Sequence, residues 1–313
     1  LADAVRAQLK QDDLDASTAM LLADLAGTLG ENSADLAQQA EEVVLADVNE
    51  QLAQEELDAS VLEEVLRQVA TQAEYSGNID LAKKIYAALA DAVKKLDDPS
   101  LATAMQKQLD DAQKRVGLIG EPLKISGETV GGEPFDWAAY EGKVVLVDFW
   151  ATWCGPCLRE IPNIRENYEK YHDLGFEVVA VNIDDQVATV EEFFAARGEF
   201  PWTTIVSSDP EARGFKTPLA RECGVNAIPF VLLVGKDGNV KAIHVRGPRL
   251  GEELAAIFGD VPNADAVPGA EPSSDDAPPA GDDTPPAGDD TPPAADDAVP
   301  EGSQSAVPNA IGD

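Results

Sequence analysis

The chain has 313 residues and a formal net charge of −35, from 58 acidic and 23 basic side chains. Such a charge argues against a nucleic-acid partner and against an anionic membrane surface, since both are bound through Lys and Arg. The three cysteines are too few for a disulfide-stapled secreted scaffold and suit a redox pair with one further thiol. The sequence contains no run of about 18 apolar residues, so no membrane span is predicted.

Residues 1–116 are predicted to form an all-α helical region. They are rich in Ala, Leu, Gln, Glu and Lys, which favour helices, and their apolar residues recur at helical spacing. Asn78 and Ser100 follow breaks in this pattern and are expected to cap two helices. Residues 63–96 weakly resemble a tetratricopeptide unit, but an ordinary helical hairpin is the preferred interpretation.

Residues 117–259 are predicted to form an α/β domain with a mixed central sheet. This part holds 16 of the 18 aromatic residues, which a packed sheet needs. The order of its elements is typical of a βαβ unit followed by a hairpin and a closing helix. The expected strands cover 143–149, 176–183, 202–207, 230–234 and 240–245, and the expected helices cover 154–171, 187–197, 216–223 and 251–258.

Residues 260–313 are predicted to form a disordered acidic tail. The segment repeats the heptapeptide PPAGDDT and contains 13 acidic residues, no basic residue and no aromatic residue. Such a composition buries too little apolar surface to offset the entropy of ordering. A solubilising or spacing role is the simplest interpretation, and a tether for a basic partner is the alternative.

The strongest chemical signal is the run WATWCGPC, which contains Cys154 and Cys157. A C-x-x-C motif between a predicted strand and a predicted helix is typical of thiol redox sites. Cys154 is expected near the helix N-terminus, where free backbone N–H groups and the helix dipole favour a thiolate. Cys157 lies one helical turn further on, within reach of Cys154. A zinc site is disfavoured, because a structural site needs four ligands, and no metal or other cofactor is expected.

Together with the strand VLVDFWAT before it and Ile228–Pro229 far downstream, this motif resembles thioredoxin over residues 120–258. The longer run GKVVLVDFWATWCGPCLREIP resembles the TlpA/ResA subgroup of exported, thioredoxin-like disulfide reductases. That subgroup carries an extra helix and strand, which residues 187–207 would supply. The resemblance implies a thioredoxin-like α/β domain with a mixed central sheet, preceded by the all-α helical region and followed by the disordered tail.

The resemblance also implies catalytic roles for four residues. Cys154 would be the attacking nucleophile and Cys157 the resolving thiol. Asp148 matches the buried carboxylate that exchanges a proton with the resolving cysteine, and burial is expected to raise its pKa. Glu160 matches an acid that follows the motif in the TlpA/ResA subgroup. Thioredoxin has a lysine near its buried aspartate where this chain has Ala180 or, with a one-residue shift of the alignment, Val181, which leaves the charge balance around Asp148 open.

The substrate is expected to lie between the dithiol and the downstream proline. Pro229 would be a cis proline facing the dithiol, and the backbone of Ile228 would pair with an extended substrate segment as an added strand. Substrate contacts are expected from Trp153, Gly155, Pro156, Ile228 and Pro229.

Several residues also have simpler interpretations. Asp148 would be exposed to water if it ended its strand, and Glu160 is an acid of the kind that the first turns of any helix favour. Cys223 is expected to pack in the core as a small apolar residue. His172 and His244 are expected at the surface, without a role.

The predicted function is thiol–disulfide exchange, in which the chain reduces disulfide-containing partner proteins and is itself reduced by a thiol electron donor. The Gly-Pro pair between the cysteines resembles the reducing members of the family. A thiol peroxidase of the peroxiredoxin type is one alternative, although Ala151 occupies the position of its threonine. Another alternative is an interaction or scaffold protein, in which the helical region binds a partner and the redox domain is a passenger.

The given sequence shows no signal peptide, but it begins at Leu1 rather than at Met, so we expect the natural N-terminus to be missing, with room for an export signal before it. The resemblance to exported reductases makes the cell envelope or periplasm the expected location, and the cytoplasm is the alternative.

Overall fold

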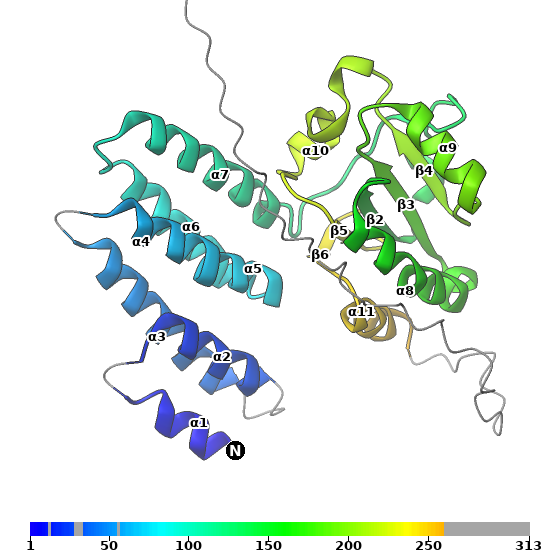
Figure 1. Cartoon of the computed structure of the whole chain (residues 1–313). Coiled ribbons are helices and arrows are strands. Elements are labelled where there is room, and N and C mark those ends of the chain that lie inside the picture. The colour runs from blue at the N-terminus through cyan, green and yellow to red at the C-terminus, as the bar shows by residue number, and fades with distance from the viewer. Residues whose placement is uncertain (12–13, 28–33, 55–56, 260–313) are drawn as a thin grey trace, which may run out of the picture. The chain divides into compact units, whose positions relative to one another are not determined.

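The computed structural model of the chain describes residues 1–11, 14–27, 34–54 and 57–259 (Figure 1). The predicted acidic tail at residues 260–313 lies outside this part. The described residues all belong to a single unit, Leu1–Ala266, and the boundary between residues 116 and 117 stays a prediction. No helix in the described part is long and apolar enough to cross a bilayer.

The N-terminal part of the described chain is helical because its apolar residues recur on one face. In α6, for example, Leu81, Ile85 and Leu89 are four residues apart and are all buried. A helical run from α4 to α5 packs against α6, as expected for the hairpin at residues 63–96. The helices are α1 (Ala2–Gln8), α2 (Ala16–Gly27), α3 (Ala34–Leu52), α4 (Ala59–Glu64), the π-helix η2 (Val65–Ala70), α5 (Thr71–Ser76), α6 (Ile79–Val93) and α7 (Pro99–Gly117).

The helix caps confirm one sequence prediction and correct another. Asn78 caps α6, since its side chain accepts a hydrogen bond from the backbone N–H of Leu81 at 3.3 Å. Ser100 does not cap α7. Asp98 takes that place and accepts a hydrogen bond from the backbone N–H of Ser100 at 2.8 Å. Pro99 stands inside the first turn, where its missing N–H needs no partner, so the cap moves to the residue before it.

Six strands of the described chain form one mixed sheet in the order β1-β4-β3-β2-β5-β6. The central strand β2 runs parallel to β3 and antiparallel to β5. The predicted α/β class with a mixed sheet is therefore confirmed, whereas β1, which pairs antiparallel with β4, was not predicted. The strands are β1 (Glu128–Thr129), β2 (Val144–Trp150), β3 (Phe176–Asn182), β4 (Thr203–Val206), β5 (Phe230–Val234) and β6 (Val240–Ile243).

Four α-helices accompany this sheet in the described chain. The helix α8 packs against β3, and α11 packs against α8 (Figure 1). The predicted helix at 216–223 is shorter than expected, because Thr217 closes a 3-10 turn through its hydroxyl, which donates to the carbonyl of Gly214 at 2.7 Å. The helices are α8 (Gly155–Tyr171), α9 (Val187–Arg197), α10 (Pro218–Glu222) and α11 (Pro248–Phe258).

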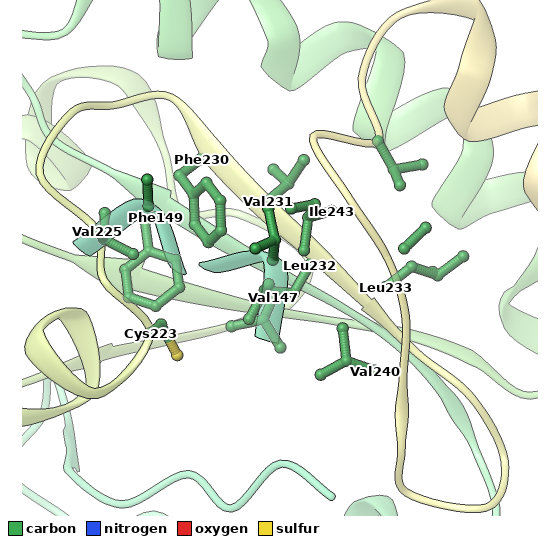
Figure 2. Close-up of a cluster of buried hydrophobic side chains, with 14 of the residues drawn as sticks. Val147, Phe149, Cys223, Val225, Phe230, Val231, Leu232, Leu233, Val240 and Ile243 are labelled. Atoms are coloured by element: carbon green, nitrogen blue, oxygen red, sulfur yellow. The ribbon is translucent and has the colours of Figure 1, made fainter. Parts of the chain in front are cut away.

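The core of the sheet lies where β2 and β5 pair. Both strands are buried along their whole length, as continuous apolar runs predict. Figure 2 shows Phe149 and Phe230 from these strands side by side, with ring centroids 5.9 Å apart, and Cys223 beside Phe149. Cys223 is 1% exposed, which confirms that it packs as a small apolar residue. Burial, together with the negative charge of Glu222, raises the pKa of its thiol to about 12.

The expectation that both histidines lie at the surface is confirmed for His172 and wrong for His244. His172 is exposed, as predicted. His244 is only 6% exposed, because it directly follows β6 and two aromatic rings cover it. Its imidazole stacks on Tyr75 with ring centroids 3.9 Å apart and meets the edge of Phe230. A single histidine carries no periodic signal that would reveal such contacts.

Leu146→Ala is expected to destabilise the sheet by about 2–5 kcal/mol, because it leaves a cavity at the buried centre of β2. Leu174, which is 45% exposed, provides the matched control. Its replacement by alanine should change the free energy of unfolding by less than about 0.5 kcal/mol. Urea unfolding followed by tryptophan fluorescence measures both, since all four tryptophans lie at residues 137–202. Equal destabilisation by the two variants would contradict this account of the core.

Candidate active site

The two motif cysteines stand at the start of α8. Cys154 is the N-cap residue, and its Sγ accepts a hydrogen bond from the backbone N–H of Cys157 at 3.2 Å. The two sulfur atoms are bonded to each other, 1.98 Å apart, so the structure holds the oxidised form of the pair. Pro156 stands in the first turn of the helix, as predicted. The N-terminal end of α8, with the backbone N–H of Cys157, is therefore directed at the Cys154 sulfur.

A hydrogen-bond network that was not predicted holds the turn before Cys154. Asp184 is 5% exposed and follows the end of β3. Its carboxylate accepts hydrogen bonds from the backbone N–H and the hydroxyl of Thr152, at 2.9 and 2.8 Å, and from the amide of Asn182 at 2.7 Å. The signal available in the sequence was the pair Asn182 and Asp184 directly after the apolar run at residues 178–181. The network ties the turn that carries the dithiol to the neighbouring strand.

Asp148 is buried on β2, as predicted, and is 3% exposed. Burial, assisted by the negative charge of Glu160, raises the pKa of its carboxyl to about 7. A carboxyl group with such a pKa can both accept and donate a proton near neutral pH. The alternative of a water-exposed residue at the strand end is excluded, because Asp148 pairs with Ala180 on β3 and with Val231 on β5.

Besides burial and the charge of Glu160, a third residue, to which the sequence did not point, acts on the pKa of Asp148. Ala180 stands opposite Asp148, so β3 supplies no cation there. The positive charge of Arg246, in the segment after β6, lowers the pKa of Asp148, but by less than burial raises it. This arginine is far from Asp148 in the sequence, and no motif marks it.

Glu160 is half-buried and joins two elements. Its Oε1 accepts hydrogen bonds from the side-chain amide of Asn163 at 2.6 Å and from the backbone N–H of Gly247 at 2.8 Å. The residue thus links α8 to the turn before α11 rather than lying free in water. Its predicted catalytic role stays a prediction, although its charge acts on the pKa of Asp148.

The predicted cis bond between Ile228 and Pro229 is confirmed. Phe149 on β2 lies opposite Phe230 on β5, so Pro229 stands beside the end of β2 that leads to the dithiol. Trp153, in the same turn as Cys154, is 61% exposed. The predicted substrate residues are therefore partly accessible around one end of β2, and their contacts with a substrate stay predictions.

Comparisons with known proteins identify the family. A family model described as Redoxin matches residues 120–267. The thiol-disulfide oxidoreductase ResA of Oceanobacillus iheyensis is 39% identical over 139 residues, which cover 44% of this chain and 68% of that protein. This chain belongs to the ResA-like thiol-disulfide oxidoreductases of the thioredoxin superfamily. The resemblance found in the sequence over residues 120–258 is confirmed.

Other ResA-like proteins match over less of their length. ResA of Geobacillus thermodenitrificans is 35% identical over 104 residues, covering 33% of this chain and 55% of that protein. Across three such relatives the chain spans 55%, 64% and 66% of their length. The crystal structure of the thioredoxin domain of a thiol-disulfide oxidoreductase from Bacteroides vulgatus matches with a TM-score of 0.40 and 22% identity, over 45% of this chain and 97% of that one.

Asp148→Asn should change the pH dependence of stability. The pKa of this carboxyl rises from an ordinary 3.8 to about 7 on folding, so the folded state binds more protons between these values. Wild-type stability therefore falls as pH rises through that window. The asparagine variant lacks this titration and should gain stability relative to wild type between pH 4 and pH 8, by on the order of 1–4 kcal/mol.

Urea unfolding at each pH measures the difference between the two chains. Asp173→Asn, at an exposed position, controls for the loss of one negative charge. A stability difference between Asp148→Asn and wild type that stays constant with pH would show that the carboxyl is not perturbed.

Proposed function

We propose that the chain reduces disulfide bonds of partner proteins through the Cys154–Cys157 dithiol. The observation that carries this proposal is the bonded cysteine pair at the start of α8, with Cys154 as the N-cap. A thiolate at that position can accept hydrogen bonds from backbone N–H groups and lies at the positive end of the helix dipole. Both interactions stabilise the thiolate, which is the reactive form. Membership in the ResA-like oxidoreductases supports the same chemistry.

The reaction proceeds in two exchange steps. The Cys154 thiolate attacks one sulfur of the substrate disulfide, forms a mixed disulfide and releases the first substrate thiolate. The Cys157 thiolate then attacks Cys154, which closes the internal disulfide and releases the second substrate thiolate. Two electrons pass from the dithiol to the substrate, and each released thiolate takes up a proton. A thiol electron donor restores the dithiol by the same exchange in the opposite direction.

Asp148 is the proposed acceptor of the Cys157 proton. Its pKa of about 7 lets it take the proton that Cys157 must lose before the second step. The negative charge of Glu160 helps to keep the pKa of Asp148 high. Glu160 would therefore affect the same proton transfer indirectly, through the pKa of Asp148.

The proposed substrate is an extended segment of a disulfide-bonded protein. The backbone of Ile228 would pair with this segment as an added strand, next to Pro229. Trp153, Gly155 and Pro156 would form the opposite side of the contact. Trp153 suits such a contact because most of its ring is accessible. The resemblance to exported reductases favours the cell envelope or periplasm as the location.

The peroxidase alternative is not favoured. The relatives described above are named thiol-disulfide oxidoreductases. Ala151, which precedes the dithiol, offers no hydroxyl at the position of the peroxiredoxin threonine. The interaction or scaffold alternative stays a hypothesis for the helical region.

Cys157→Ser is expected to trap mixed disulfides, because the first exchange can occur while the second cannot. Incubation of the reduced variant with a disulfide-bonded protein such as insulin should give a covalent adduct that dithiothreitol releases. Mass spectrometry should locate the adduct on Cys154. Cys223→Ala, which alters a buried thiol away from the exchange steps, is the matched control and should reduce insulin at about the wild-type rate.

A second variant, Cys154→Ser, should form no adduct and show no reduction. If wild type fails to reduce insulin and Cys157→Ser forms no adduct with it, the proposed reduction of protein disulfides is wrong.

A further inference from the structure

A buried ionic cluster connects the N-terminal helices with the end of the sheet. Glu74, on α5, is completely buried. Its carboxylate accepts hydrogen bonds from Tyr86 Oη at 2.5 Å and from Arg115 Nε at 2.7 Å. His244 Nε2 lies 2.8 Å from the same carboxylate, which can only accept, so the imidazole donates. Residues from α5, α6, α7 and the segment after β6 therefore meet at one carboxylate.

The negative charge of Glu74 persists because its partners outweigh its burial. Burial alone would raise the pKa of this carboxyl, but the hydrogen bonds from His244, Arg115 and Tyr86, together with the charge of Arg115, lower it to about 2. A buried carboxylate left without these partners would be strongly destabilising. Glu74 is therefore charged near neutral pH, and its two hydrogen bonds with Arg115 fix the orientation of the guanidinium.

The guanidinium of Arg115 also donates hydrogen bonds to the loop before Pro229. While Nε and Nη2 donate to Glu74, at 2.7 and 3.1 Å, Nη1 donates to the carbonyl of Gly224 at 3.0 Å and lies 3.4 Å from Oδ1 of Asn226. A planar guanidinium presents its donors in a rigid fork, so fixing one edge aims the other. One side chain of α7 thus holds the loop formed by residues 224–228.

The backbone of this loop also lies directly against α7. Gly224 has a φ of +67°, and a Cβ atom added there would lie 2.1 Å from the carbonyl oxygen of Asp111. Only glycine fits this approach, so the start of the loop is pressed onto the helix. Lys114 Nζ lies 3.4 Å from the carbonyl oxygen of Arg221, just before the loop. The loop is therefore placed by α7 at its start and leads directly into Ile228 and Pro229.

We infer that Arg115, oriented by Glu74, is a positioning residue that sets the 224–228 loop for pairing with a protein substrate. The inference rests on the proposed function, because it assigns Ile228 to the substrate contact. The N-terminal helices thereby determine how well the site binds an extended polypeptide. A small disulfide needs only the dithiol and does not depend on the position of this loop.

Arg115→Gln tests the inference in the full-length chain with dithiothreitol as the electron donor. For insulin, KM should rise about tenfold while kcat changes by less than about twofold, because binding is lost and the exchange chemistry is kept. With bis(2-hydroxyethyl) disulfide the rate should stay within about twofold of wild type. Arg67→Gln, at an exposed position of η2, is the matched control and should leave both substrates unaffected. An unchanged KM for insulin, or an equal loss with both substrates, would overturn the inference.

Arg115→Lys separates positioning from stability. The lysine keeps a positive charge beside Glu74 but donates from one nitrogen atom in place of the planar fork. Its unfolding midpoint in urea should lie closer to wild type than that of Arg115→Gln, while KM for insulin should stay raised. Full recovery of KM by lysine would mean that the fork to the loop is not needed.

Amide hydrogen exchange gives a readout that does not depend on catalysis. In Arg115→Gln, exchange at residues 225–228 should accelerate about tenfold, while exchange in β2 stays as in wild type. Unchanged exchange in the loop would refute the inference even if activity changed. If wild type reduces neither disulfide, the proposed function fails, and the exchange result still decides whether Arg115 holds the loop.

Discussion

The pairing of β2 along both of its edges is the constraint on which the site depends. Strand β3 runs parallel to it and β5 runs antiparallel. The carboxyl ends of β2 and β3 and the beginning of β5 therefore meet at one edge of the sheet. A shift of register by one residue would turn Asp148 to the opposite face of the sheet. The turn to Cys154, the carboxylate of Asp184 and the bond to Pro229 converge there for this reason.

The features that could be predicted from the sequence are those with a local signal. Apolar runs located β2 and β3 to within a residue, and the C-x-x-C spacing located the dithiol. The burial of Asp148 followed from its apolar neighbours on the strand. These patterns depend on residues that are close together in the chain, so they can be recognised without knowledge of the tertiary structure.

The features that escaped prediction depend on residues far apart in the chain. Nothing next to His244 reveals that Tyr75 covers it, and nothing next to Arg246 shows that its charge acts on Asp148. The two residues of β1 are too few to alternate visibly. Ser100 failed as a cap for a more local reason, since the position of Pro99 in the first turn gives that role to Asp98.

Two buried carboxyl groups show how differently one chemical group can behave in the same chain. Glu74 and Asp148 are both excluded from water, yet the pKa of the first falls to about 2 and that of the second rises to about 7. Hydrogen-bond donors surround Glu74, whereas burial dominates at Asp148. The first carboxyl is thus an anion near neutral pH, suited to holding other groups in place, and the second is suited to proton transfer.

The burial of Cys223 has a consequence for electron transfer. With the pKa of its thiol near 12, this cysteine stays protonated and enclosed beside Phe149, so it does not compete as a nucleophile. Cys154 and Cys157 then form one two-electron redox couple, and Cys223 takes no part in it. Such a chain can cycle between its dithiol and disulfide forms without pairing the wrong sulfur atoms, and its redox titration should follow a single Nernst curve with n = 2.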